Sequence, residues 1–272
     1  MRIVILSSSI YSETACAIAV RLAEMQFVPV GVLSLSTLHR ATLLRKVGQW
    51  GVRGVAAYAR AKLFSRPNQN QPRVRNLYLQ PLLERRGEWF SSLRDVSKVY
   101  NFPVVLSNDQ NARESIARLK QWSPDLIVFA GGNILRQQLL AIPRLGVVNV
   151  HLGLLPEIRG MSSPEWSLLT RVPVGITIHF MDSGIDTGPV LQRYQYSGAG
   201  HCDSLSDLRN QLIAFGVEKI GEAAAALDRG NIVATPQSDI HKDNQCFVMH
   251  EWLQARAAER LTSLRSAAET SA

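Results

Sequence analysis

Two short apolar runs constrain the fold of this chain more than any other feature of its sequence. They lie at residues 125–130 (DLIVFA) and 146–150 (GVVNV), and each is followed by a glycine or a polar residue. Strands without polar alternation are typically buried on both faces, as in a parallel sheet that helices cover. Both runs therefore predict central strands of such a sheet.

The beginning of the chain predicts the same architecture. Residues 2–7 are apolar and β-branched, and residues 28–34 form a second such run. Between them, serines 8, 9 and 12 can cap a helix that reaches about Met25. A β-α-β opening is typical of a parallel sheet. We expect an α/β, Rossmann-like fold, with an open, mostly parallel sheet and helices on both faces.

Further elements are expected along the rest of the chain. The predicted helices cover residues 88–100, 109–122, 204–229 and 250–268, and the predicted strands cover residues 103–106, 175–181, 189–196 and 232–237. The alternation in residues 189–196 is that of an exposed or edge strand. We therefore divide the chain into a main domain (residues 1–196) and a mainly helical C-terminal extension (residues 197–272).

The composition is that of an ordinary globular protein. Hydrophobic residues make up 46% of the chain. No apolar run approaches the roughly 20 residues that cross a bilayer, and the first run is too short for a secretory signal. The three cysteines are odd in number and far apart, and His201, His241 and His250 lack ligand spacing. We therefore expect no disulfide, no metal and a cytoplasmic location.

The net charge of +8 belongs to one segment of the chain. Residues 39–76 contain nine Lys or Arg and no acid. Three interpretations of this basic insert stay open: the solvated face of a helix that covers the sheet or lines a homodimer contact, a guide for an anionic substrate, or a helix on a membrane surface. The anionic substrate would be tRNA, a nucleotide-sugar or a phosphorylated metabolite.

Polar groups suited to catalysis follow the second apolar run. Asn149 and His151 are two residues apart, so in a strand they project from one face. An amide and an imidazole aimed at one point can polarise a carbonyl and hold the oxyanion that forms when it is attacked. Asp186 lies in a turn after the next strand and can orient the imidazole or move protons. We expect two neighbouring strand ends to bring these residues together, although each alone reads as a local hydrogen-bonding or Asx-turn residue.

The stretch from Asn149 to Gly188 resembles the signature of the formyltransferases that use 10-formyltetrahydrofolate. The matching elements are Asn149-Val-His151, Leu-Leu-Pro156, Arg159-Gly160, Gly175-Ile-Thr177 and Ile185-Asp186-Thr-Gly188. The resemblance covers roughly residues 1–196, is sharpest over 124–191, and implies that residues 1–196 form a formyltransferase catalytic domain. It implies an enzyme in which Asn149 and His151 stabilise the oxyanion, while Asp186 orients His151 and helps to move a proton.

The same resemblance implies where the formyl donor binds. Asn133, Ile134, Leu135 and Arg136 occupy the place where the family's backbone holds the pterin ring of the folate, and Ile185 is expected to contact it too. From the residues alone, Gly131 and Gly132 would simply turn the chain into the following helix. Formyl-CoA in place of the folate stays open.

The acceptor amine is less constrained than the donor. Glycinamide ribonucleotide enzymes follow their first strand with a glycine-rich phosphate loop, whereas this chain has Ser-Ser-Ser-Ile-Tyr at residues 7–11. The residues after Tyr196 read as helices rather than as the β-barrel of methionyl-tRNA enzymes. We therefore expect a primary amine of a small substrate, with a nucleotide-linked amino sugar as the leading candidate and a biosynthetic amine as the next. The alternatives are a methionyl-tRNA formyltransferase-like enzyme without the barrel, and an inactive folate-binding module.

Overall fold

The computed structural model describes residues 1–36, 76–85, 87–238 and 244–270. The basic insert expected at residues 39–76 lies outside the described residues, apart from Asn76. Its three interpretations therefore stay as they were.

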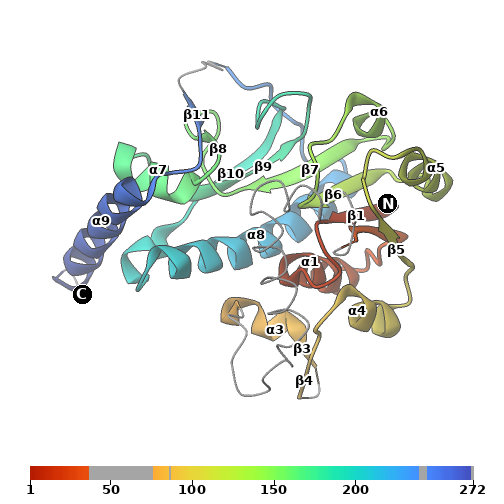
Figure 1. The fold of residues 1–272 in the computed structure, drawn as a ribbon, viewed down its shortest axis with the longest axis horizontal. Helices are drawn as coiled ribbons and strands as arrows, with labels where there is room; N and C mark the ends of the chain where they lie inside the picture. Colours follow the sequence, from red (N-terminus) through yellow and green to blue (C-terminus); the bar gives the residue numbers. More distant parts are fainter. Residues whose placement is uncertain (37–75, 86, 239–243, 271–272) are drawn as a thin grey trace, which may run out of the picture.

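A seven-stranded, mostly parallel sheet forms the centre of the described structure (Figure 1). In spatial order it consists of β10 (Val190–Gln195), β9 (Gly175–Phe180), β7 (Gly146–His151), β6 (Leu126–Ala130), β1 (Ile3–Ser7), β2 (Gly31–Leu35) and β5 (Val104–Ser107). The five strands from β7 to β5 pair in parallel, whereas β9 runs antiparallel to both β7 and β10. This confirms the open, mostly parallel sheet and the edge strand that the sequence predicts.

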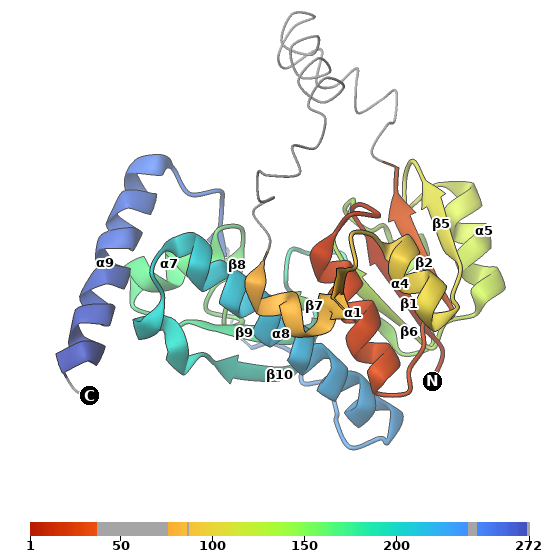
Figure 2. The ribbon, with the colours of Figure 1, turned by 90° about the horizontal axis from the view of Figure 1, so that it is seen from below.

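Helices cover both faces of the sheet, as Figure 2 shows from below. One face packs against α1 (Glu13–Glu24), α4 (Leu93–Tyr100) and α8 (Leu205–Asp228). The other face packs against α5 (Arg113–Trp122) and α6 (Gln137–Leu140). Alternate residues of each central strand enter the two cores: in β1, Ile3 and Ile5 face α1, while Val4 and Leu6 face α5. The sheet is therefore buried on both sides, which explains its unbroken apolar runs.

The start of the chain follows the predicted capping pattern. Ser12 is the N-cap of α1, and its Oγ accepts a hydrogen bond from the Ala15 N–H at 3.2 Å. The second strand begins at Gly31 rather than at residue 28. At Gly31 a Cβ atom would lie 2.6 Å from the Trp122 ring, so only glycine lets α5 pack this closely.

Two helix predictions start too early. The helix expected from residue 88 begins at Leu93, because Ser92 caps it by accepting from the Asp95 N–H at 3.4 Å. The residues before it form a hairpin of β3 (Glu84–Arg85) and β4 (Glu88–Trp89), after η1 (Leu77–Leu79) and α3 (Gln80–Leu83). The helix expected from residue 109 begins at Arg113, because Asp109 forms an Asx turn with the Asn111 N–H at 2.9 Å.

The C-terminal part of the chain packs on the sheet rather than standing apart from it. Val217 and Ile220 of α8 belong to the same core as α1. A further core joins α8 to η2 (Ser197–His201), α7 (Ser163–Thr170) and α9 (Glu251–Thr270). The short strand expected at residues 232–237 is reduced to one bridge between Val190 and Thr235. The division after residue 196 stays a prediction.

In the described part of the chain, none of the helices is both long and apolar enough to cross a membrane.

Candidate active site

Strands β7 and β9 position the first two polar side chains. In their antiparallel register Asn149 lies directly opposite His179. Residues directly opposite in such a pair project from the same face with their side chains in contact. Asn149 Nδ2 accordingly lies 3.3 Å from His179 Nε2. The sheet backbone therefore fixes the separation of this amide and this imidazole.

His179 is also part of this group of polar side chains, although the sequence did not place it among the candidate site residues. Its side chain is buried, with 1% exposed, and its Nδ1 lies 2.9 Å from the Phe180 carbonyl oxygen. In β9, Thr177 and His179 share one face of the strand, whereas Ile176 and Ile178 lie on the other and enter the apolar cores. The alternation of side chains does not give the register between β9 and β7. It is this register that places the polar face of β9 against Asn149.

Asp186 reaches the cluster on a loop that folds back over the sheet. Since β9 runs antiparallel to β7, the carboxyl end of β9 lies beside the amino-terminal half of β7, away from His151. The prediction that two neighbouring strand ends bring these residues together is therefore wrong in detail. The loop is tied by Asp182, whose Oδ1 accepts from the Gly184 N–H at 3.0 Å and the Thr187 hydroxyl at 2.6 Å. Asp186 itself is left-handed, with φ of 53°, a conformation that Asp tolerates.

The Asp186 carboxylate joins both histidines. Its Oδ2 lies 3.3 Å from His151 Nδ1 and accepts a 2.8 Å hydrogen bond from the Gly160 N–H. Its Oδ1 lies 3.5 Å from His179 Nε2. Asn149, His151, His179 and Asp186 thus form one connected group, which we call the polar cluster.

Burial keeps His179 in its neutral form. Desolvation lowers the pKa of the His179 imidazole below its ordinary value of 6.5, and Asp186 opposes this only in part. A neutral ring that donates from Nδ1 to the Phe180 carbonyl carries its lone pair on Nε2. That lone pair accepts one N–H of the Asn149 amide, which leaves the second N–H of Asn149 for another acceptor.

His151 lies between two oxygen acceptors. Its side chain is buried, with 5% exposed, and its Nε2 lies 2.8 Å from the Ile158 carbonyl oxygen. Because Nδ1 faces Asp186, the ring can donate at both nitrogens only when it carries two protons. Gly153 leaves room for the ring, since a Cβ there would lie 2.9 Å from His151 Nε2.

Hydrogen bonds from the side chains of Gln237 and Thr177 hold the backbone around the polar cluster. The Gln237 amide donates to the carbonyls of Asp186, at 3.0 Å, and Gly188, at 2.7 Å. The Thr177 hydroxyl donates to the Gly153 carbonyl at 2.7 Å and accepts from the Leu155 N–H at 3.0 Å. A glutamine in a coil carries no local signal of such a role, whereas Thr177 lies within the motif quoted above.

The segment expected to hold the formyl donor is a turn fixed by a buried amide. Gln110 is fully buried, accepts from the Asn133 N–H at 3.0 Å and donates to the carbonyls of Ser7 and Gly131, each at 3.3 Å. A side chain on Gly132 would collide with it, at 2.0 Å from Gln110 Oε1. Position 132 therefore requires a glycine, and Gly131 adopts a φ of 98° that favours one.

The side chains expected to contact the donor differ in exposure. Ile134 and Ile185 are 87% and 50% exposed, so both are free to contact an apolar ligand. Leu135 is buried in the core beneath α6, so only its backbone can serve a ligand. The Asn111 amide donates to the Ile134 carbonyl at 3.0 Å and accepts from the Arg136 N–H at 2.8 Å.

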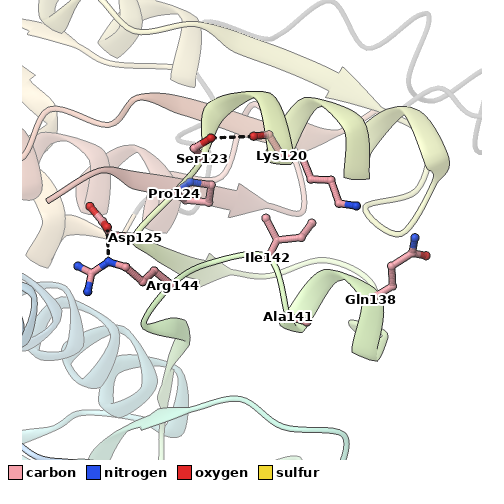
Figure 3. A pocket seen from close by; sticks show the side chains of 8 residues that line it. All are labelled: Lys120, Ser123, Pro124, Asp125, Gln138, Ala141, Ile142 and Arg144. Carbon is pink, nitrogen blue, oxygen red and sulfur yellow. Dashed lines mark hydrogen bonds and ion pairs between the residues drawn. The ribbon is translucent and has the colours of Figure 1, made fainter.

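A hollow elsewhere on the molecule is not part of this site. Figure 3 shows Lys120 of α5 and Gln138 of α6 around it, together with Arg144, which forms a 2.7 Å ion pair with Asp125. Its volume is about 630 Å³. Asp125 and Arg144 lie just before β6 and β7, so the hollow reaches the amino ends of these strands, whereas His151 lies at a carboxyl end.

Comparison with known proteins shows which proteins this chain is similar to. A family model described as "Formyl transferase" matches residues 90–224. The chain is 36% identical over 146 residues to the methionyl-tRNA formyltransferase of Geobacter metallireducens, which covers 53% of this chain and 47% of that protein. The chain spans about half the length of the curated relatives that it matches.

Solved structures share the fold at low sequence identity. Glycinamide ribonucleotide transformylase 1 from Symbiobacterium toebii superposes with a TM-score of 0.55 at 17% identity, covering 88% of this chain and 95% of that one. An N-formyltransferase from Helicobacter canadensis, solved with folinic acid and dTDP-3-aminofucose, superposes with a TM-score of 0.52 at 16% identity, covering 88% and 68%. These two structures support the fold.

Proposed function

This chain belongs to the formyltransferase superfamily, and from that premise we propose that it transfers a formyl group from 10-formyltetrahydrofolate to a primary amine. One observation carries the proposal. Asn149 and His151 of β7 and Asp186 from the loop after β9 come together at the carboxyl end of β7, with His179 between them. Ligands of open α/β sheets bind at this end of the strands.

Two exposed apolar side chains, one on the turn after β6 and one next to Asp186 in the chain, fit a folate. A pterin is flat and partly apolar, and the exposed Ile134 and Ile185 side chains can flank such a ring. The turn from Gly131 to Arg136 is held by Gln110 and Asn111, so its backbone is preorganised for a ligand edge. The bound folate supplies the formyl group; the residues below act on it.

In the proposed reaction Asn149 is the main donor to the formyl oxygen. When an amine attacks the formyl carbon, negative charge develops on that oxygen. The second N–H of Asn149 can bind it, because among the described residues His179 accepts only the first. A fixed donor in a site shielded from water does not need to reorganise as the charge forms. His179 thus acts as a positioning residue.

His151 and Asp186 handle the proton in this proposal. His151 Nε2–H can exchange the Ile158 carbonyl for the charged formyl oxygen, and thereby add a second donor. The attacking amine loses a proton as the new C–N bond forms, and N10 of the folate gains one as the old C–N bond breaks. Asp186, 3.3 Å from His151 Nδ1, keeps the imidazole oriented and can relay that proton.

The leading acceptor class is an amine on a nucleotide-linked sugar. The Helicobacter canadensis structure, with dTDP-3-aminofucose bound, has the same fold. The second candidate is a methionyl-tRNA substrate, which the curated relatives named methionyl-tRNA formyltransferase and the basic segment at residues 39–76 favour. In either case the polar cluster would perform the same chemistry.

A mass-spectrometric screen tests this function. The chain is incubated with 10-formyltetrahydrofolate and separate pools of nucleotide-sugar amines, small biosynthetic amines and charged initiator tRNA. We expect one acceptor class to gain the mass of a single formyl group. Single-turnover rates of Asn149→Ala, His151→Ala and Asp186→Ala are then compared with wild type, and rates near wild type in all three would refute the assignment. Binding of folinic acid without turnover on any acceptor would instead favour an inactive folate-binding module.

A further inference from the structure

A second hollow lies away from the polar cluster, where the end of α7 meets α9. Its volume is about 570 Å³, within the range of small-molecule sites. Leu168 of α7, Val174 before β9 and Leu264 of α9 supply apolar walls. The hollow therefore joins three parts of the chain that are distant in sequence, and it shares no residue with the polar cluster.

A buried hydroxyl lines this hollow without a hydrogen-bond partner. Ser167 is 0% exposed, and among the residues that the structure describes its Oγ has no donor or acceptor within reach. Serine in a helix usually bonds back to the carbonyl four residues earlier. A buried hydroxyl left unpaired destabilises the folded state, and a bound molecule with a polar atom would remove that penalty.

Two arginines give the hollow a positive charge. Arg171 and Arg260 both line it, and within the described ranges neither forms an ion pair. Their neighbours on α9 behave differently: Arg256 pairs with Glu259 at 3.5 Å and Arg265 with Asp203 at 3.2 Å. Two unneutralised guanidinium groups at one opening attract an anion.

The backbone conformation of Arg171 is consistent with a binding role for its side chain. Arg171 ends α7 in the left-handed region, with φ of 61°. Glycine adopts this conformation at least cost and is the usual residue at such a helix end. An arginine there is strained relative to glycine, which is consistent with a role for the guanidinium group.

We propose that this hollow binds a small organic anion, with an apolar body and one phosphate or carboxylate group. The apolar body packs against Leu168, Val174 and Leu264, and the anionic group binds Arg171 and Arg260. Ser167 donates to a polar atom of the body. The inference does not depend on the proposed formyl transfer, since none of these residues belongs to the polar cluster.

Isothermal titration calorimetry of the full chain with phenyl phosphate tests the inference. Inorganic phosphate tests the anionic part alone, benzyl alcohol tests the apolar part alone, and benzoate distinguishes carboxylate from phosphate. We expect phenyl phosphate or benzoate to bind at least about tenfold more tightly than inorganic phosphate or benzyl alcohol. Which of the two anions binds more tightly identifies the anionic group.

Variants identify the location of the binding. Arg171→Ala with Arg260→Ala should weaken phenyl phosphate binding by at least about tenfold, because both charged contacts are lost. Arg256→Ala, on the same helix but outside the hollow, is the matched control and should bind like wild type. Leu264→Glu should abolish binding by placing a like charge at a half-exposed wall position. Circular dichroism melting verifies that each variant folds.

Three results would overturn the inference. The first is the absence of heat with either aromatic anion at up to about 10 mM. The second is binding that the arginine double variant and Leu264→Glu leave unchanged. The third is equal weakening in Arg256→Ala, which would indicate a nonspecific effect of net charge.

Discussion

Asp186→Asn is the most informative single change, because it removes one charge and almost no volume. Asparagine tolerates the left-handed backbone that Asp186 adopts, at φ of 53°. Its side-chain oxygen can still accept from the Gly160 N–H, which Asp186 Oδ2 binds at 2.8 Å. The loop is therefore expected to keep its shape, and the free energy of unfolding should change by less than about 1 kcal/mol.

The expected loss of rate follows from the interaction with His151. Asp186 Oδ2 lies 3.3 Å from His151 Nδ1, in a site where both side chains are largely buried. A hydrogen bond to a charged group contributes about 1.5–3 kcal/mol. If that contribution is made in the transition state, kcat should fall by roughly 10- to 150-fold. The affinity for the formyl donor should stay near that of wild type, because Ile134 and Ile185 are unchanged.

Single-turnover formyl transfer, followed by mass spectrometry on the acceptor found in the screen, measures this effect. Asp182→Asn is the matched control: Asp182 lies in the same loop, and among the described residues its side chain accepts only from Gly184 and Thr187, bonds that an amide oxygen can retain. The control should react at the wild-type rate. An Asp186→Asn rate within about threefold of wild type, in a folded protein, would contradict the role proposed for the carboxylate.

Three further predictions concern stability. The pKa of His179 lies below its ordinary value of 6.5, so below that pH the unfolded chain binds more protons than the folded one. The free energy of unfolding should therefore fall as the pH decreases from 6.5. His179→Gln should weaken this pH dependence in urea titrations. Gly132→Ala should lower the free energy of unfolding by about 1–3 kcal/mol and weaken folinic acid binding, since its Cβ would lie 2.0 Å from Gln110 Oε1. Gly230→Ala is the control for binding: a Cβ there would meet nothing within 4 Å, so folinic acid binding should be unchanged. Leu6→Ala, at a fully buried position, should cost about 2–5 kcal/mol in urea, and a loss below about 1 kcal/mol would contradict the packing described.

The sheet was the most predictable part of the fold. The apolar runs at residues 125–130 and 146–150 became β6 and β7, each within one residue at either end, because a strand buried on both faces has an unmistakable composition. The early start predicted for α4 was avoidable. Ser92 is followed by Asp95 three residues later, and this spacing is a recognised N-terminal signal.

The polar cluster was predictable only in part. Asn149 and His151 share a face because side chains in a strand alternate with a period of two residues, and this spacing can be seen directly in the sequence. Membership of His179 depends on the register between β7 and β9, and a shift by one residue would have turned it away. Gln237 and Gln110 act through hydrogen bonds to distant backbone atoms, and such contacts leave no periodic or compositional trace in the sequence.

The pairing of β8 (Arg159–Gly160) with β11 (Gln245–Cys246) has a consequence for synthesis of the protein. Gly160 supplies the N–H that Asp186 accepts, and a Cβ at Gly160 would lie 2.3 Å from the Cys246 carbonyl oxygen. A ribosome makes β7 and the Asp186 loop long before β11. The nascent chain can therefore build its sheet early, but the backbone beside the polar cluster is completed only when residues 245–246 emerge.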